Sequence, residues 1–220
     1  MGIEPDWPAP SNVTALTTLR GADFDAVFRE QFVQSHCCKI QQVHGAAAVD
    51  VTQMESGAEA DACYSRDASI ACRVVTADCL PLLVCNRQGT EVAAVHAGWR
   101  GLAAGVIENT FARLQTPPDE LLVWLGPVIS QQHFEVGKEV RDAFVNTAPT
   151  RLVSRVSGAF EPHGSKFMAD LPGLARARLE HLGCRAIFGG ERCTFSDAGS
   201  FYSWRRDRSL GRLHSVIAFS

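Results

Sequence analysis

Residues 82–101 read LLVCNRQGTEVAAVHAGWRG, in which two short apolar segments flank a polar loop that contains glycine. Short segments rich in branched residues predict strands, so this pattern predicts a β-hairpin with its loop at residues 86–90. The second strand ends at His96, and helical spacing follows the glycine-rich segment after it. One face of this single expected helix is formed by Leu102, Val106, Phe111 and Leu114.

The same kinds of signal extend through the rest of the chain. Further strands are predicted at residues 13–19, 70–75, 121–125, 185–188 and 214–219. Further helices are predicted at 137–145 and 171–182, the second with Asp170 as its N-cap and Gly183 as its stop. Hairpins mixed with helices are typical of an α+β fold with mixed sheets rather than of a repeating βαβ fold. Because no repeat or low-complexity segment interrupts the pattern, a single domain is predicted over residues 1–220.

Composition excludes several classes of protein. The 220 residues carry 21 Lys and Arg against 24 Asp and Glu, a net charge of −3, so no nucleic-acid or anionic-membrane partner is expected. A hydrophobic content of 46% is sufficient for a substantial core. No apolar run approaches the ~18 residues of a membrane span. The first ten residues, MGIEPDWPAP, are unlike a secretory signal, so a cytoplasmic location is expected.

Eight cysteines are distributed along the chain, several of them inside apolar segments such as ACRVV and LLVCN. A disulfide framework is typical of exported chains shorter than about 100 residues, which this chain does not resemble. No pair has C-x-x-C spacing, so a zinc knuckle and a thioredoxin motif are both excluded. Most of these thiols are therefore expected to be ordinary buried side chains.

Three segments each place a metal-binding or nucleophilic side chain where an apolar run ends beside glycine or proline. They are residues 41–45 (QQVHG), 76–81 (TADCLP) and 95–101 (VHAGWRG). Strand ends that open into turns are where rigid folds present reactive groups. If these ends meet, His44, Cys79 and His96 supply two imidazoles and a thiolate. That donor set suits zinc and leaves its fourth position open for water or substrate, as in a catalytic site.

Other interpretations of the same residues stay open. His44 could cap a turn, Cys79 could be a buried thiol and His96 a core histidine. Alternatively, Cys79 is a nucleophile with His96 as its base and Asp78 or Asp61 as the orienting group. The metal site ranks above this second reading, because no helix begins directly after Cys79 to lower its pKa. In the metal site, Asp78 and Gln42 are expected to carry a proton or to orient a ligand.

Two arginines are candidates for binding an anion. Arg100 follows His96 at the start of an expected helix, although it could simply pack along Trp99. Arg206 lies in the segment FYSWRRD, which joins aromatic rings to guanidinium groups and could stack a base and hold an anion. The ordinary alternative for Arg206 is an ion-pair network at a strand end.

At these residues the chain resembles the YfiH-like family, which is also called the laccase-domain or multicopper polyphenol oxidase family. The resemblance runs from about Gln41 to the C-terminus, and its most specific parts are VHAGWRG and TADCLP. The further motifs that carry it are QQVHG, WLGPVI, HFEVG, CTF and FYSWRRD with the later GR.

The resemblance implies a four-layer α/β/β/α sandwich and a zinc site formed by His44, Cys79 and His96. It also implies a purine nucleoside phosphorylase that splits adenosine, inosine, guanosine or methylthioadenosine with phosphate, and an additional adenosine deaminase activity. Copper-dependent phenol oxidation and editing of peptidoglycan precursors have been assigned to relatives as well. The family therefore predicts the fold and the ligands better than the substrate.

One segment departs from the family pattern. Before residue 41 the family has a longer run that contains S-x-R-x-G-G-x-S, whereas this chain has only Thr17 to Gly21 and a short passage to Cys38. The domain is therefore expected to have a shortened N-terminal segment. Arg20 is similar to the family's arginine in that run, which implies a role in binding phosphate or substrate.

The leading hypothesis is a zinc-dependent phosphorylase, with Arg100 or Arg206 on the phosphate and Asp78 or Asp61 handling the proton. Its expected partners are a nucleoside and phosphate, and no oligomeric state is predicted. The alternatives are an amidase that edits peptidoglycan precursors, a copper-dependent polyphenol oxidase, and a binding protein without catalysis. Copper is the alternative metal because a thiolate ligand also suits it. Multicopper chemistry needs many histidines, and only two of the seven lie in the specific motifs.

Overall fold

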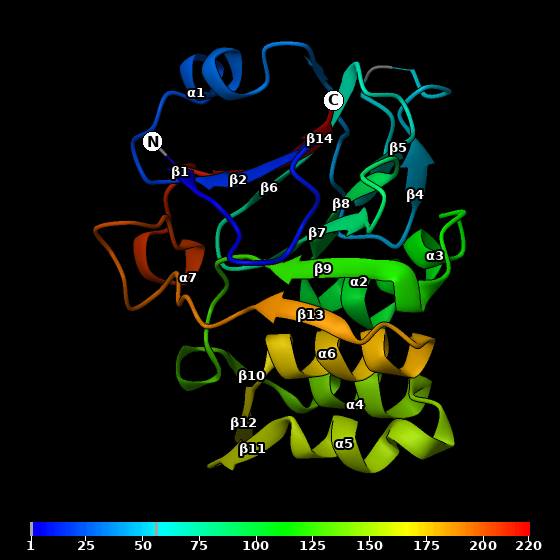
Figure 1. Ribbon diagram of the computed structural model, residues 1–220. Helices are drawn as coiled ribbons and strands as arrows, with labels where there is room; N and C mark the ends of the chain where they lie inside the picture. The colour runs from blue at the N-terminus through cyan, green and yellow to red at the C-terminus, as the bar shows by residue number, and fades with distance from the viewer. Residues whose placement is uncertain (1, 56) are drawn as a thin grey trace.

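The computed structural model describes residues 2–55 and 57–220, and it confirms the predicted α+β fold with mixed sheets (Figure 1). The larger sheet has six strands in the order β13 (Ala186–Gly189), β9 (Leu121–Leu125), β7 (Leu80–Asn86), β8 (Val92–Ala97), β5 (Ala62–Ser65) and β4 (Ala48–Asp50). The second sheet has five strands in the order β1 (Gly2–Ile3), β2 (Val13–Thr18), β14 (Leu213–Phe219), β6 (Ile70–Thr76) and β3 (His36–Cys37). Both sheets contain parallel and antiparallel pairs.

The two sheets and their helices form the four predicted layers. Between the sheets lies one apolar cluster, to which β7 contributes Leu83 and Cys85. The opposite face of β7 contributes Leu82 and Val84 to a cluster with helices α2 (Trp99–Ala103), α3 (Val106–Phe111), α4 (Lys138–Thr147), α5 (Val153–Gly158) and α6 (Leu171–Leu182). Helix α1 (Phe24–Gln31) covers the outer face of the five-stranded sheet. Because β7 is buried on both faces, it is apolar from Leu80 to Cys85, and each buried leucine contributes roughly 1.5–3 kcal/mol.

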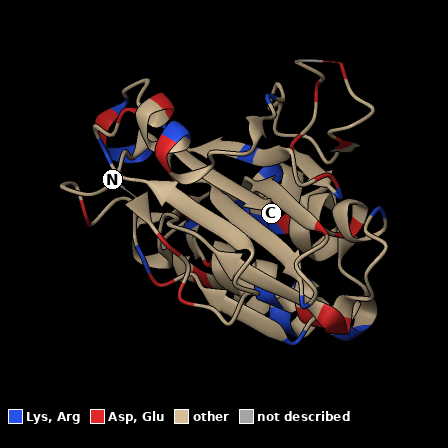
Figure 2. Cartoon of the chain, turned by 45° about the horizontal axis from the view of Figure 1, so that its top comes forward, with Lys and Arg blue, Asp and Glu red and all other residues tan. Residues whose placement is uncertain are grey.

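The hairpin predicted at residues 82–96 is confirmed, with Leu82 opposite Val95 and Cys85 opposite Val92. The capped helix is confirmed as α6, because the Asp170 carboxylate accepts a hydrogen bond from the backbone N–H of Gly173 and Gly183 ends the helix in the left-handed region. Charged residues are interspersed along helices and loops, while the strands are largely uncharged (Figure 2).

The single helix predicted after His96 is wrong, because the structure has two short helices in its place. Helix α2 ends at Ala103, and α3 begins at Val106. Gly105 between them has φ of 91°, a left-handed conformation that stops one helix and redirects the chain into the next. Both helices nevertheless pack against β8, so the apolar face was identified although the break was not.

Several short elements carry no strong sequence signal and were not predicted. A small third sheet contains β10 (Glu135–Val136), β12 (Lys166–Ala169) and β11 (Phe160–His163), and helix α7 (Trp204–Asp207) follows the last long loop. Two- to four-residue elements are too short for periodicity to identify them. No helix in the described parts of the chain has the length and apolar character needed to cross a membrane.

Candidate metal centre and its cavity

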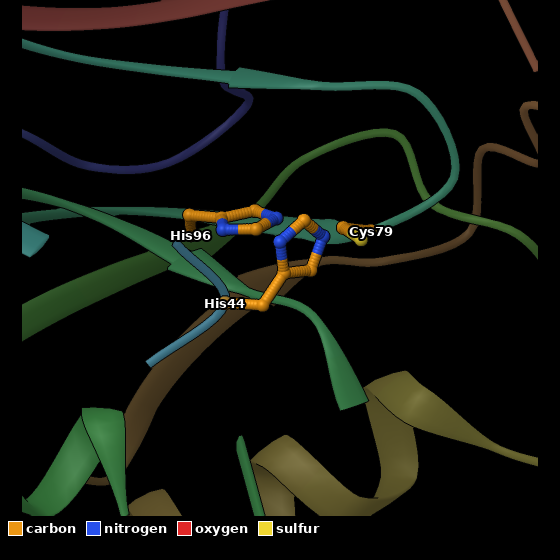
Figure 3. Close-up of side chains that lie close together, drawn as sticks. All are labelled: His44, Cys79 and His96. Carbon is orange, nitrogen blue, oxygen red and sulfur yellow. The ribbon is translucent and has the colours of Figure 1, made fainter. Parts of the chain in front are cut away.

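The side chains of His44, Cys79 and His96 converge from three separate segments (Figure 3). His44 lies in the loop before β4, Cys79 directly precedes β7, and His96 lies in β8. Because β7 and β8 are antiparallel neighbours with Pro81 opposite His96, the start of one strand meets the end of the other. The donor atoms of the three side chains all lie within 4.8 Å of one another.

A single buried carboxylate positions both histidines. Asp61 is fully buried and accepts hydrogen bonds from the backbone N–H groups of Val43 (3.2 Å), His44 (2.9 Å) and Gly45 (2.6 Å). These bonds hold His44 in a left-handed conformation, with φ of 60°. The same carboxylate lies 2.7 Å from Nδ1 of His96, which leaves Nε2 as the ring nitrogen available to a metal.

The electrostatics favour a thiolate and an anionic carboxylate in this cluster. Burial by itself raises the pKa of the Cys79 thiol, but hydrogen bonds and charge from His44 and His96 lower it to about 6. Burial lowers the pKa of His96, yet its bonds to Asp61 and Cys79 raise that pKa to about 9. Burial raises the pKa of Asp61, but its bonds to His96 and to the Gly45 and Val43 N–H groups hold it below its usual range.

The two glycines of the AGWRG segment leave room for the cluster. A Cβ at Gly98 would lie 3.0 Å from Cys79 Sγ and 3.3 Å from the His44 ring. A Cβ at Gly101 would lie 2.4 Å from the backbone oxygen of Gly45, so this position brings the His44 turn close to α2. Real Cβ atoms do not approach a backbone oxygen as closely as at Gly101, so that position requires glycine. At Gly98 the contacts would be tighter than most real ones, so Cys79 and His44 would have to shift by a few tenths of an ångström to admit a side chain.

The residues present fit a zinc ion. Two imidazole nitrogens and one thiolate sulfur form a set that zinc binds in catalytic sites, with a fourth position left for water or substrate. In the parts of the chain that the structure describes, this is the one group of three or more His, Cys, Asp or Glu side chains placed to share an ion. The thiolate form of Cys79 is the form that binds a metal.

A cavity of about 480 Å³ opens beside the three side chains. Aromatic and aliphatic side chains form part of its wall, including Trp99, Ile129, Phe134 and Trp204. Charged and polar groups form the rest, including Gln42, Thr76, Asp78, Arg100, Arg205 and Arg212. The predicted residues Gln42, Asp78 and Arg100 therefore lie at the cavity together with the three ligand candidates.

Asp78 connects the Cys79 segment to the C-terminal part of the chain. It has φ of 87° and is only 9% exposed. One carboxylate oxygen accepts a hydrogen bond from the Thr194 hydroxyl (2.6 Å), and the other accepts from the backbone N–H of Arg205 (2.7 Å). Asp78 thus fixes the start of helix α7 beside the cavity.

Gln42 ties the His44 loop to β6. Its amide nitrogen donates to the carbonyl of Val75 (2.9 Å), and its amide oxygen accepts from the N–H of Val75 (2.7 Å). Both ends of the amide are therefore paired with backbone. The contacts match the orienting role predicted for Gln42 better than direct contact with a substrate.

Three residues predicted to contact substrate lie outside the cavity wall. Asp61 is buried behind His96 with its oxygens engaged. The Arg206 guanidinium donates to three backbone carbonyls and pairs with Asp207. Arg20 pairs with the same Asp207 at 2.9 Å and lies over the ring of Tyr202. Arg206 and Arg20 pair with residues of α7 and of the loop before it, whereas Asp61 pairs with the His44 turn and His96.

The arginines that do line the cavity were only partly identified from the sequence. Arg205 and Arg206 are neighbours on α7, and adjacent helical residues point about 100° apart, so only one of them can face the cavity. Arg205 faces it and Arg206 does not. Arg212 and Trp204 also line it, and both lie in the C-terminal motif segment. Knowing which face of helix α7 is turned to the cavity would have distinguished Arg205 from Arg206. A helix of four residues is too short for the sequence pattern to show that face.

Comparisons with known proteins identify the family of this chain. Residues 23–220 match a family model described as multi-copper polyphenol oxidoreductase laccase. A relative from Shigella flexneri named purine nucleoside phosphorylase YfiH is 42% identical over 241 aligned positions, covering 98% of this chain and 97% of the relative. A relative from an unknown prokaryotic organism, named adenosine deaminase RL5, is 34% identical and covers 84% of this chain and 72% of its own length.

A solved crystal structure shows the same fold. A protein from Neisseria meningitidis superimposes with a TM-score of 0.90 at 38% sequence identity. The match covers 100% of this chain and 99% of the other.

Proposed function

This chain belongs to the multi-copper polyphenol oxidoreductase laccase family, and from that premise we propose that it is a zinc-dependent purine nucleoside phosphorylase. Its substrates are adenosine, inosine, guanosine or methylthioadenosine, together with inorganic phosphate. In the reaction, the bond between the purine nitrogen and C1′ of the sugar breaks. A bond from a phosphate oxygen to C1′ forms, and the departing base takes up a proton.

The observation that carries the proposal is the shared cavity of the metal-binding side chains and the arginines. Its volume of about 480 Å³ falls within the usual range for small-molecule sites. Trp99, Phe134 and Trp204 offer ring faces on which a purine can stack. Arginine offers the planar donors that match a phosphate, which an enzyme of this class must bind beside the nucleoside.

The side chains at the cavity have separate tasks in this reaction. Positive charge develops on the sugar as the base departs, so an anion held next to the sugar stabilises the transition state. Arg100 is the proposed phosphate contact, because its guanidinium lies over the Trp99 ring at the cavity. Of the two predicted proton carriers, Asp78 lines the cavity and Asp61 does not, so Asp78 is the proposed proton carrier. A zinc ion held by His44, Cys79 and His96 would supply Lewis acidity there.

Deamination of adenosine is the proposed second activity. In that reaction water adds to C6 of the purine and ammonia leaves. Three protein ligands leave one position of a zinc ion open, an arrangement suited to activating water. The name of the relative that is 34% identical supports this second activity.

The proposal includes a shortened N-terminal segment before residue 41. The alignment with the Shigella flexneri relative spans 241 positions, more than the 220 residues of this chain, as a shorter segment here would produce. We propose one YfiH-like domain over residues 1–220 that lacks part of the family's N-terminal run.

The decisive experiment measures products of adenosine with and without phosphate. Adenine and ribose 1-phosphate are expected only with phosphate, whereas inosine formed without phosphate reports deamination. Variants Cys79→Ala and His44→Ala should lose phosphorolysis by at least about a hundredfold. Cys37→Ala and His36→Ala change the same residue types outside the cavity and serve as matched controls. Absence of turnover of any purine nucleoside would refute the proposal.

Metal analysis of the same preparation separates the alternatives. About one equivalent of zinc is expected, since the described residues offer one three-ligand cluster. More than one equivalent of copper, with oxidation of a phenol, would instead favour the polyphenol oxidase. Release of an amino acid from a peptidoglycan precursor without nucleoside turnover would favour the amidase.

A further inference from the structure

The arginines at the cavity differ in how far their donors are already used. The Arg205 guanidinium donates twice to the carbonyl of Glu135, at 3.1 and 3.2 Å, and lies over the Phe134 ring. Both of its terminal nitrogens therefore already donate to the protein. The guanidinium groups of Arg100 and Arg212 each retain at least one terminal nitrogen without a protein partner among the described residues.

Arg212 is held in place while part of its guanidinium stays free. One terminal nitrogen donates to the carbonyls of Ser209 (3.2 Å) and Gly211 (2.9 Å). The other terminal nitrogen and Nε have no partner in residues 2–55 and 57–220. The guanidinium carbon lies 5.7 Å from the centre of the Trp204 ring, and the side chain is half-buried. These contacts restrict the side chain before any ligand arrives.

Arg100 and Arg212 form matching pairs with tryptophans on the cavity wall. The guanidinium carbon of Arg100 lies 4.5 Å from the centre of the Trp99 ring, and that of Arg212 lies 5.7 Å from the centre of the Trp204 ring. A guanidinium that stacks on a ring keeps the N–H groups along its edge available, and that edge matches two oxygens of a phosphate. Asp78 is the one carboxylate among the described residues that lines the cavity. It accepts from Thr194 and Arg205 and pairs with neither of these arginines.

We propose that Arg212, positioned by Trp204, binds the phosphate substrate together with Arg100. This assignment rests on the proposed phosphorylase function and adds to it a residue of the phosphate site. Two guanidinium groups balance the two negative charges that phosphate carries near neutral pH. Because two backbone carbonyls and the Trp204 ring already hold Arg212, little of its side-chain entropy is lost when phosphate binds.

The test compares Arg212→Gln with Arg208→Gln. Arg208 lies 5.8 Å from the same Trp204 ring but does not line the cavity, so it is a matched control. Titration of each protein with inorganic phosphate alone should show affinity reduced about tenfold or more in Arg212→Gln and within about twofold of wild type in Arg208→Gln. Arg212→Lys should recover part of the affinity, since the charge returns without the bidentate edge.

Steady-state kinetics give an independent measurement. In Arg212→Gln the KM for phosphate should rise by about tenfold, while the KM for adenosine changes by less than about twofold. Arg208→Gln, which changes an arginine outside the cavity wall, should leave both KM values at the wild-type level. Trp204→Ala should raise the KM for phosphate as well, because Arg212 then loses the ring that positions it.

The outcomes distinguish this assignment from the proposed function. The phosphorylase proposal fails if the protein turns over no nucleoside. The anion site still stands in that case if the protein binds phosphate and Arg212→Gln lowers its affinity for phosphate. If phosphorolysis occurs and Arg212→Gln binds phosphate as tightly as Arg208→Gln, the function stands and the assignment of Arg212 is overturned. Thermal unfolding of each variant checks that it is folded. If Arg212→Gln does not fold, the phosphate affinity of Arg212→Lys provides the test instead.

Discussion

The Asp61 carboxylate lies 2.7 Å from Nδ1 of His96 and accepts the backbone N–H of His44 at 2.9 Å. One buried side chain thereby orients both histidines of the candidate metal centre. The ring nitrogen of His96 that faces away from Asp61 is directed towards the metal position. Residues that orient a ligand in this way commonly change metal affinity by 10–100-fold when they are replaced.

Asp61→Asn should therefore weaken zinc binding by about 10–100-fold with little change in volume. The amide has one acceptor oxygen where the carboxylate has two, so the donors at Val43, His44 and Gly45 and at His96 cannot all be satisfied. Competition with a chromophoric chelator measures the affinity. Asp67→Asn, which affects an exposed turn carboxylate, is the control. Equal zinc affinity in wild type and Asp61→Asn would contradict this role.

Gly98→Ala should lower the zinc content without unfolding the chain. The added methyl group would lie 3.0 Å from Cys79 Sγ and 3.3 Å from the His44 ring, so both ligands must move apart. Gly158→Ala provides the matched control, because its Cβ would meet nothing within 4 Å. Elemental analysis and thermal unfolding of the two variants give the comparison. A zinc content in Gly98→Ala equal to that of Gly158→Ala would show that the cluster tolerates the methyl group.

Arg100→Gln should lower activity without changing stability, whereas Arg206→Gln should lower stability. Arg100 is exposed at the cavity, so its loss should reduce phosphorolysis by about tenfold or more and leave the melting temperature unchanged. Arg206 donates to the carbonyls of Thr194, Phe195 and Phe201 and pairs with Asp207. Its replacement leaves those carbonyls without donors and should lower the free energy of unfolding by about 1–3 kcal/mol. The reverse pattern would place the anion site at Arg206.

His214 should make the protein less stable in mild acid. Burial and the charge of Arg73 lower its pKa to about 4, and Asp25 opposes them only partly. The unfolded chain takes up this proton near pH 6.5, so it binds more protons than the folded chain between that pH and about 4. Stability from this residue is therefore present at neutral pH and is lost as the pH falls through this interval.

His214→Gln removes the titrating group and should flatten that dependence. Urea unfolding at pH 7 and at pH 4.5 measures the change in free energy for each protein. The change should be smaller in His214→Gln than in wild type, and His36→Gln serves as the control. A change of the same size in all three proteins would mean that other groups cause the acid sensitivity.

The amino-acid sequence alone determined the local elements with strong signals. Residues 82–96 form the predicted hairpin because two apolar runs of matching length flank a glycine-containing loop. Helix α6 begins after Asp170 and ends at Gly183 because a side-chain cap and a left-handed residue act within one turn of the chain. The motifs around His44, Cys79 and His96 were also visible, since each one ends an apolar segment.

Only the tertiary structure decided which of the other side chains face the cavity. Arg206 and Arg20 carry a guanidinium group as Arg212 does. Both of them pair with Asp207, however, and neither lines the cavity. Asp61 was expected at the substrate and instead lies behind His96, because β5 and β8 are neighbours in the sheet. The Arg20–Asp207 and Asp61–His96 contacts join residues far apart along the chain, and local periodicity carries no information about such pairings.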